Sequence, residues 1–173
     1  MKTVAKIAGM VLICLILALI VLRFSGFDPT GDTPGPKNYP GLWLRGTVVA
    51  TPVTDWSFAT QYKTDKLETR TWYMIPHSVT TGFAVHSGQL YITSMFGKGV
   101  PFPKGKSWVA NVIRDPHVRI RFGNNLYDCA LTEVTDTDER AAVLGPRAKP
   151  NPLPPDANSG DIPVMHLFRA VSQ

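Results

Sequence analysis

The chain has 173 residues, a formal net charge of +5 and 44% hydrophobic residues, which is the balance of a globular protein with one sizeable core. Fifteen prolines and fourteen glycines favour a turn-rich fold over a helical bundle. Of the two cysteines, Cys14 lies in an N-terminal apolar run, so Cys129 has no partner for a disulfide within the folded part, and a cysteine-based metal cluster is excluded.

The apolar run at the N-terminus, residues 7–22, lies between Lys6 and Arg23. A bilayer core about 30 Å thick needs roughly 20 apolar residues in a helix, and flanking basic side chains extend a shorter run by reaching the headgroups. The run is longer than the apolar core of a usual signal peptide, and no small-x-small cleavage motif follows it. The sequence therefore predicts a single-pass anchor, residues 1–24, that is retained in a lipid bilayer. The basic residues before the run favour a cytoplasmic N-terminus and a domain on the extracytoplasmic, periplasmic side.

Prolines and glycines crowd residues 25–43, and this composition predicts an extended linker between the anchor and the folded part. The remainder, residues 44–173, is predicted to form one domain. Its first half has β-branched and aromatic residues in short runs bounded by Gly and Pro. The predicted strands are residues 44–50, 57–62, 69–75, 80–86 and 90–94. Residues 87–89, Ser-Gly-Gln, join the last two strands as a hairpin.

The second half begins with a glycine-rich loop, residues 95–105, and alternates helical and strand patterns after it. Apolar residues at helical spacing predict a helix over 106–114, which ends before an Asp-Pro pair. Strands 117–122 and 126–134 flank a Gly-Asn-Asn turn, and Thr135 is placed to cap a helix over 136–144. A loop over 145–161 precedes a last strand, 162–171. Six or seven strands with two short helices indicate a mainly β fold, a small β-barrel.

Three pieces of the second half carry a family resemblance. They are SWVANVIRDPHVRIRFG from residue 107, then Tyr127, then TEVTDTDERA from residue 132. In order and spacing they resemble the split β-barrel proteins, which include the pyridoxamine-phosphate-oxidase-like flavoproteins and, closer to this chain, the deazaflavin-dependent nitroreductase group. The match spans roughly residues 65–144, and residues 162–168 resemble the last strand of the family. The resemblance implies a split β-barrel that holds FMN or a deazaflavin in a groove and that pairs with a second barrel.

The resemblance also indicates a phosphate site at Arg70, Ser94 and Lys98. A serine at a strand end, followed by Gly97 and Gly99 around a lysine, lets backbone N–H groups reach an anion. An arginine adds a bidentate clamp on the phosphate. The alternative interpretation is a glycine-rich surface loop with solvated cations.

Trp72 and Tyr73 are the candidates for stacking on the cofactor ring, and the alternative is that such aromatics form core and dimer interface. The four histidines are far apart, so no metal site is predicted. His77, after Pro76 at a strand end, is the best candidate for substrate contact, and the alternative, which the sequence favours, is a structural or surface role. Cys129 stands in a strand pattern and is predicted to be buried and inert. No catalytic residue is identified.

Departures from the family pattern leave two hypotheses open. Residues 64–68 lack the glycine that the family carries before its arginine strand, and Phe96 with the Pro-Phe-Pro at 101–103 alters the loop after Ser94. The first hypothesis is a membrane-anchored flavin or deazaflavin oxidoreductase that acts on a hydrophobic acceptor such as a quinone or a nitro compound. The second is a cofactor-free barrel, an accessory or structural subunit of a larger membrane complex. Under both hypotheses the expected partners are the lipid bilayer and either a second copy of the chain or another subunit of a membrane complex. Nucleic acid is not expected as a partner, because no helix carries a stripe of basic residues.

Overall fold

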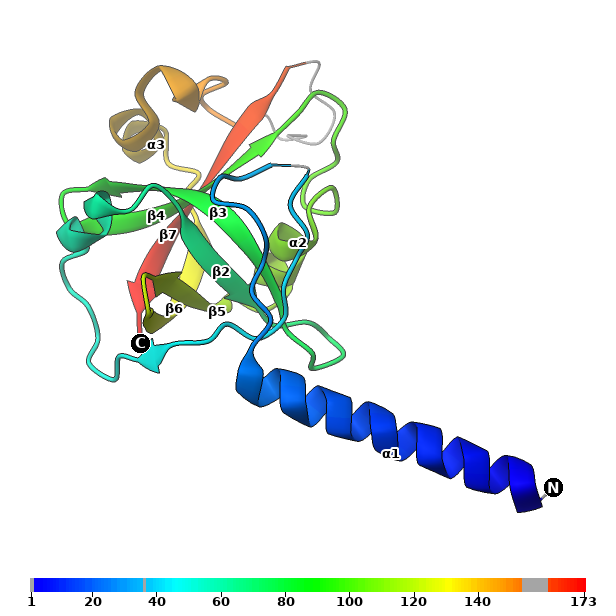
Figure 1. The fold of residues 1–173 in the computed structure, drawn as a ribbon. Helices are drawn as coiled ribbons and strands as arrows, with labels where there is room; N and C mark the ends of the chain where they lie inside the picture. Colours follow the sequence, from blue (N-terminus) through cyan, green and yellow to red (C-terminus); the bar gives the residue numbers. More distant parts are fainter. Residues whose placement is uncertain (1, 36, 154–161) are drawn as a thin grey trace.

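The protein forms a closed barrel of antiparallel strands with one long helix outside it (Figure 1). The structure, a computed structural model, describes residues 2–35, 37–153 and 162–173. Six strands form the barrel: β2 Asp65–Thr69, β3 His77–His86, β4 Gln89–Phe96, β5 His117–Phe122, β6 Asn125–Glu133 and β7 Val164–Ser172. They pair in the order β6-β5-β2-β3-β4-β7, and β7 returns to β6 and closes the barrel. A short strand, β1 (Thr47–Val48), adds to β6 in parallel. The predicted mainly β barrel is thereby confirmed.

Alternating side chains of the strands fill the barrel. In β5, for example, every second residue from Val118 to Phe122 is buried, and these side chains meet Leu67 of β2 and Phe168 of β7 in one core cluster. Helix α2 (Ser107–Arg114) closes on this core through its own buried residues, Trp108, Val109 and Val112. The predicted helix is therefore confirmed, and it begins one residue later than the sequence pattern suggests.

Both predicted hairpins form. Ser87 and Gly88 join β3 to β4 with φ angles of +51° and +76°, the left-handed conformation of a two-residue type I′ turn. Gly123 joins β5 to β6 at φ +58°. Gln89, predicted in the first turn, instead begins β4 and pairs with His86.

Two predicted strands of the first half differ in the structure. Residues 57–62, predicted as a strand, form a 3₁₀ helix, Ser57–Gln61, because Asp55 Oδ1 accepts hydrogen bonds from the backbone N–H and the hydroxyl of Ser57 and turns the chain. This turn places Trp56 in the core, where it is 2% exposed. Residues 44–50 supply only the two residues of β1.

The strand predicted at 69–75 lies earlier, as β2. Three of its five residues are charged, and each has a partner that is remote in sequence. The Thr81 hydroxyl donates to the buried Asp65 carboxylate, Lys66 Nζ donates to Gly31 O at 2.6 Å, and Glu68 Oε2 accepts from the backbone N–H of Leu44 at 2.6 Å. Residues 70–76 form a loop outside the barrel.

Helix α3 (Thr137–Leu144) has a different cap from the predicted one. Asp136, one residue after Thr135, is the N-cap, and its Oδ1 accepts a hydrogen bond from the N–H of Glu139 at 2.8 Å. The chain continues as a 3₁₀ helix, Gly145–Ala148. The rest of the predicted loop lies partly outside the described residues, and the last strand begins at Val164, just after Pro163.

Helix α1 (Lys2–Ser25) projects away from the barrel, and its described residues are exposed or nearly so (Figure 1). It is long and apolar enough to cross a membrane, a property that a signal sequence near the N-terminus shares. The segment after it is not an extended linker. It returns along the barrel, since the N–H of Phe27 donates to Trp43 O, Asp28 pairs with Arg121, and Gly41 bridges to Ser78.

Candidate functional site

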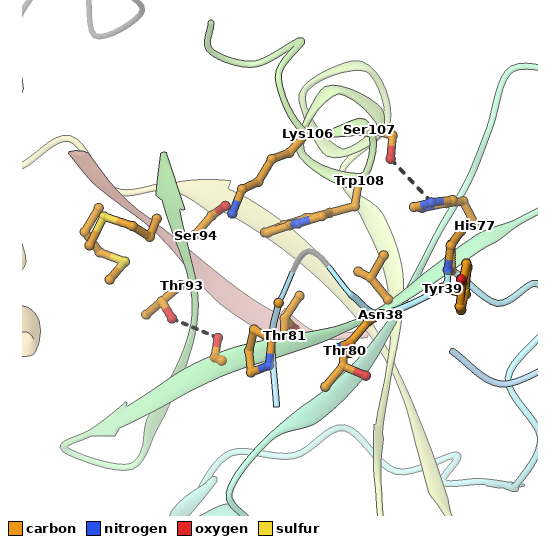
Figure 2. Close-up of a pocket in the computed structure, with 17 residues that line it drawn as sticks. Asn38, Tyr39, His77, Thr80, Thr81, Thr93, Ser94, Lys106, Ser107 and Trp108 are labelled. Atoms are coloured by element: carbon orange, nitrogen blue, oxygen red, sulfur yellow. Dashed lines mark hydrogen bonds between the residues drawn. The ribbon is translucent and has the colours of Figure 1, made fainter. Parts of the chain in front are cut away.

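A cavity of about 610 Å³ opens between the start of β3, the end of β4 and the N-terminal end of α2 (Figure 2). The returning segment forms its outer wall through Pro34, Gly35 and residues 38–40. This volume lies within the range of about 300–1,000 Å³ that small-molecule and cofactor sites occupy. The wall exists because Pro and Gly let this segment turn back onto β2 and β3, where Thr80 and Lys66 donate hydrogen bonds to Gly31 O.

Two polar side chains in this cavity have buried atoms without a hydrogen-bond partner among the described residues. Ser94, near the end of β4, is 2% exposed and its hydroxyl is unpaired. At the start of β3, His77 has an unpaired, buried Nδ1, while its Nε2 lies 3.3 Å from the Ser107 hydroxyl. Burial lowers the pKa of His77, which favours the neutral ring. An unpaired buried polar group costs about 1–3 kcal/mol, so these atoms are places where a ligand has hydrogen bonds to gain.

Lys106 brings positive charge into the same cavity. It is the N-cap of α2, and its side chain reaches past the helix end toward Ser94 (Figure 2). Its Nζ lies 5.4 Å from the centroid of the Phe96 ring, and burial lowers the pKa of this amine. The side chain of this N-cap residue makes no hydrogen bond to the first N–H groups of α2. A helix N-terminus of this kind attracts anions, and the lysine adds to that field.

The cavity also has an apolar part, beside the polar side chains of Asn38, Thr80, Thr81 and Thr93. Trp108 from α2, Val79 from β3, Met95 from β4 and Met165 from β7 line it. A ligand that satisfies both parts of the cavity is an anion with an attached apolar or aromatic body. A phosphate-bearing flavin or deazaflavin has this character, so the residues present fit the cofactor class that the sequence resemblance implies.

The predicted cofactor residues are divided between three places. Ser94 lines the cavity. Arg70, Trp72 and Tyr73 lie in the exposed loop between β2 and β3, where Arg70 Nη1 is 3.9 Å from Asp115 Oδ2. None of these three lines the cavity.

Gly97, Lys98 and Gly99 lie in the exposed turn that follows β4, and they do not line the cavity either. The structure therefore does not bring Arg70 and Lys98 to Ser94 within one cavity. Their role as cofactor ligands stays a prediction. Cys129 is buried as expected, and burial raises the pKa of its thiol to about 12, so the thiolate is scarce at neutral pH.

Sequence reasoning missed Lys106, Ser107 and the wall formed by residues 34–40. A signal for the first two was present, because a residue at the start of an amphipathic helix lies at the positive end of the helix dipole. The wall had no such signal, since its position depends on hydrogen bonds between residues far apart in sequence.

No protein-family model matches this sequence, and no curated protein matches it. Solved structures with a similar chain path include a pyridoxamine 5′-phosphate oxidase-like protein of Listeria innocua, which is 19% identical over 68% of this chain and 89% of that one, with a TM-score of 0.46. A FAD-binding protein of Mesorhizobium loti is 17% identical over 66% and 82%, with a TM-score of 0.41. HutZ, the heme storage protein of Vibrio cholerae, is 16% identical over 67% and 85%, with a TM-score of 0.45. The closed six-strand barrel of this chain agrees with the barrel fold that the sequence resemblance implies.

Proposed function

We propose that this protein is a membrane-anchored oxidoreductase that binds FMN or a deazaflavin in the cavity beside Ser94, His77 and Lys106. The observation that carries ligand binding is the pair of unpaired buried atoms, Ser94 Oγ and His77 Nδ1, in the same cavity as the half-buried amine of Lys106. The cofactor class rests on the sequence resemblance of residues 107–141 to the split-barrel flavoproteins.

Each part of the cavity has a distinct task in this proposal. Lys106, the Ser94 hydroxyl and the first N–H groups of α2 bind the phosphate, and Trp108 with Val79 packs against the ring system. A bound flavin or deazaflavin supplies hydride transfer to an acceptor. The wall from Pro34 to Pro40 keeps water from the ring, and His77, with Nε2 beside the Ser107 hydroxyl, is placed to hold or donate a proton at the edge of the cavity.

The second candidate function is a cofactor-free accessory barrel of a membrane complex. One observation favours it: Pro34, Gly35 and residues 38–40 of the chain itself line the cavity, and Pro34 lies within van der Waals range of the space beside Gly82 on β3. An absorbance spectrum of the detergent-purified protein separates the two functions, because a retained flavin or deazaflavin absorbs in the visible or near-ultraviolet range.

Replacing Lys106 by Met is expected to weaken binding of FMN or oxidised deazaflavin at least tenfold. A charge-assisted hydrogen bond contributes about 1.5–3 kcal/mol, and one decade of affinity is about 1.4 kcal/mol. Methionine keeps the apolar stem against Phe96, so the fold is preserved. Fluorescence titration of wild type, Lys106→Met and Ser94→Ala measures the effect.

Lys104→Met is the matched control, because Lys104 is exposed and lies outside the cavity. Arg70→Ala tests the alternative phosphate site. A tenfold loss with Arg70→Ala and none with Lys106→Met would move the phosphate to the β2–β3 loop. If neither cofactor binds at high micromolar concentration, the enzyme proposal is wrong and the accessory barrel is favoured.

We further infer that α1 remains attached and spans the bilayer. The protein is expected to stay with the membrane fraction after a high-salt wash, because salt screens electrostatic attachment and leaves an apolar span in place. Mass spectrometry of the purified protein is the complementary measurement. A mature chain that starts near Ser25 would mean that α1 is a cleaved signal.

A further inference from the structure

The loop between β2 and β3, residues 70–76, exposes three consecutive large side chains. Trp72 is 79% exposed, Tyr73 is 49% exposed and Met74 is 90% exposed. The Trp72 and Tyr73 rings pack edge to face at a centroid distance of 5.3 Å, so they form one surface. Three consecutive exposed residues of this kind indicate a contact with something outside the described fold.

This loop lies at the end of the barrel from which α1 departs (Figure 1). Its two stems are Thr69 and His77, which pair with each other in the β2–β3 ladder. Glu68, the residue before the stem Thr69, interacts electrostatically with Arg23, the last basic residue of α1. Arg23 itself lies over the ring of Trp43, 5.9 Å from its centroid.

The surroundings of the loop are basic. The guanidinium of Arg114, at the end of α2, donates a hydrogen bond to Arg70 O, which brings two arginines together at the base of the loop. Asp115 faces Arg70 at 3.9 Å and offsets part of this charge. Ile113, which precedes Arg114 in α2, is 50% exposed.

We propose that residues 70–76, the membrane-contact loop, lie in the headgroup layer of the bilayer and bind an anionic lipid surface. Tryptophan and tyrosine concentrate at this depth of a membrane, and each nearby Lys or Arg gains about 1 kcal/mol from anionic lipids. The proposal rests on the proposed anchoring by α1, which carries the barrel to the same surface. It does not depend on the cofactor.

This contact has a consequence for the cavity. His77, where the membrane-contact loop returns to β3, also lines the cavity. Two attachments, α1 and the loop, fix the orientation of the barrel, and they hold the His77 side of the cavity toward the bilayer. A hydrophobic acceptor dissolved in the membrane then has a short path to that side.

The test uses the full chain with Cys14→Ala and Met74→Cys, labelled with the polarity-sensitive dye NBD and reconstituted in phosphatidylcholine vesicles that contain phosphatidylglycerol. Cys129 is 1% exposed and is protected from the label by burial. The matched control is His86→Cys in the same background, an exposed position at the other end of β3. The NBD at position 74 is expected to emit at shorter wavelength than the NBD at position 86 and to be quenched several-fold less by aqueous iodide.

Flotation of the same vesicles separates failure of the loop from failure of the anchor. If the protein floats with the vesicles but the NBD emission at both positions is that of an aqueous environment, the proposed membrane contact of the loop is wrong and anchoring by α1 is still supported. Protein that does not float would overturn the anchoring on which this inference rests. A position-74 signal that fades as the protein is diluted in lipid would assign the loop to a second copy, and an equal signal in neutral vesicles would remove the anionic headgroup from the proposal.

Discussion

Replacing Trp108 by Ala is expected to destabilise the barrel by roughly 3–5 kcal/mol, the loss typical of a buried aromatic. Trp108 is 6% exposed, and its ring meets Phe168 of β7 edge to face at a centroid distance of 5.7 Å. The ring therefore joins α2 to the opposite side of the barrel, and its removal leaves a void between the two. Denaturant unfolding of the full chain in a mild detergent, followed by circular dichroism, measures the change.

Ile113→Ala is the control for this prediction. Ile113 is on the same helix but is 50% exposed, so its truncation is expected to change the free energy of unfolding by less than about 1 kcal/mol. Alanine also has the higher helix propensity, which offsets part of any loss. Similar losses for the two variants would mean that the inner face of α2 is assigned wrongly.

The second half of the fold was predictable because its signals are local. Gly123 supplies the φ > 0 that the turn between β5 and β6 requires, and the Asp115-Pro116 pair ends α2 where the spacing of Trp108 and Val112 stops. Each of these elements is determined by residues within a few positions of one another. Sequence patterns therefore predict such locally determined elements well.

The first half was predicted less well because its strands depend on remote partners. β2 has an Asp, a Lys and a Glu in five residues, which resembles a solvated turn. What makes it a strand is a set of contacts with the Leu44 backbone, Gly31 and Thr81, which lie between 16 and 35 residues away in sequence. Dependence on remote contacts also explains which parts of the cavity were predictable. Ser94 was predicted from its place at a strand end, whereas the wall that includes Pro34 and Pro40 depends on how the chain returns from α1.

Asp65→Asn is expected to stabilise the protein at neutral pH, which is unusual for the loss of a buried charge. Asp65 is 1% exposed, and burial raises the pKa of its carboxyl from an ordinary 3.8 to about 6, even though the Thr81 hydroxyl donates to its oxygens at 2.7 and 2.8 Å. Because the folded state holds the proton more tightly than the unfolded state, folding is favoured below the unfolded pKa. Stability is lost as the pH rises from about 4 to about 6, and it stays lower above that range.

At about 1.4 kcal/mol per pH unit, this displacement corresponds to roughly 3 kcal/mol at pH 7, which is the upper bound of the gain for Asp65→Asn. Asparagine keeps an acceptor for the Thr81 hydroxyl and has no charge to desolvate. The stabilities of wild type and variant are therefore expected to agree near pH 4, to separate as the pH rises from about 4 to about 6, and to stay apart up to pH 8. Asp138→Asn, which removes an exposed carboxylate, controls for net charge. A variant that is less stable than wild type at pH 7 would show that Thr81 and Lys66 hold Asp65 as a stabilising anion, and that β2 is fixed in the barrel by this buried charge.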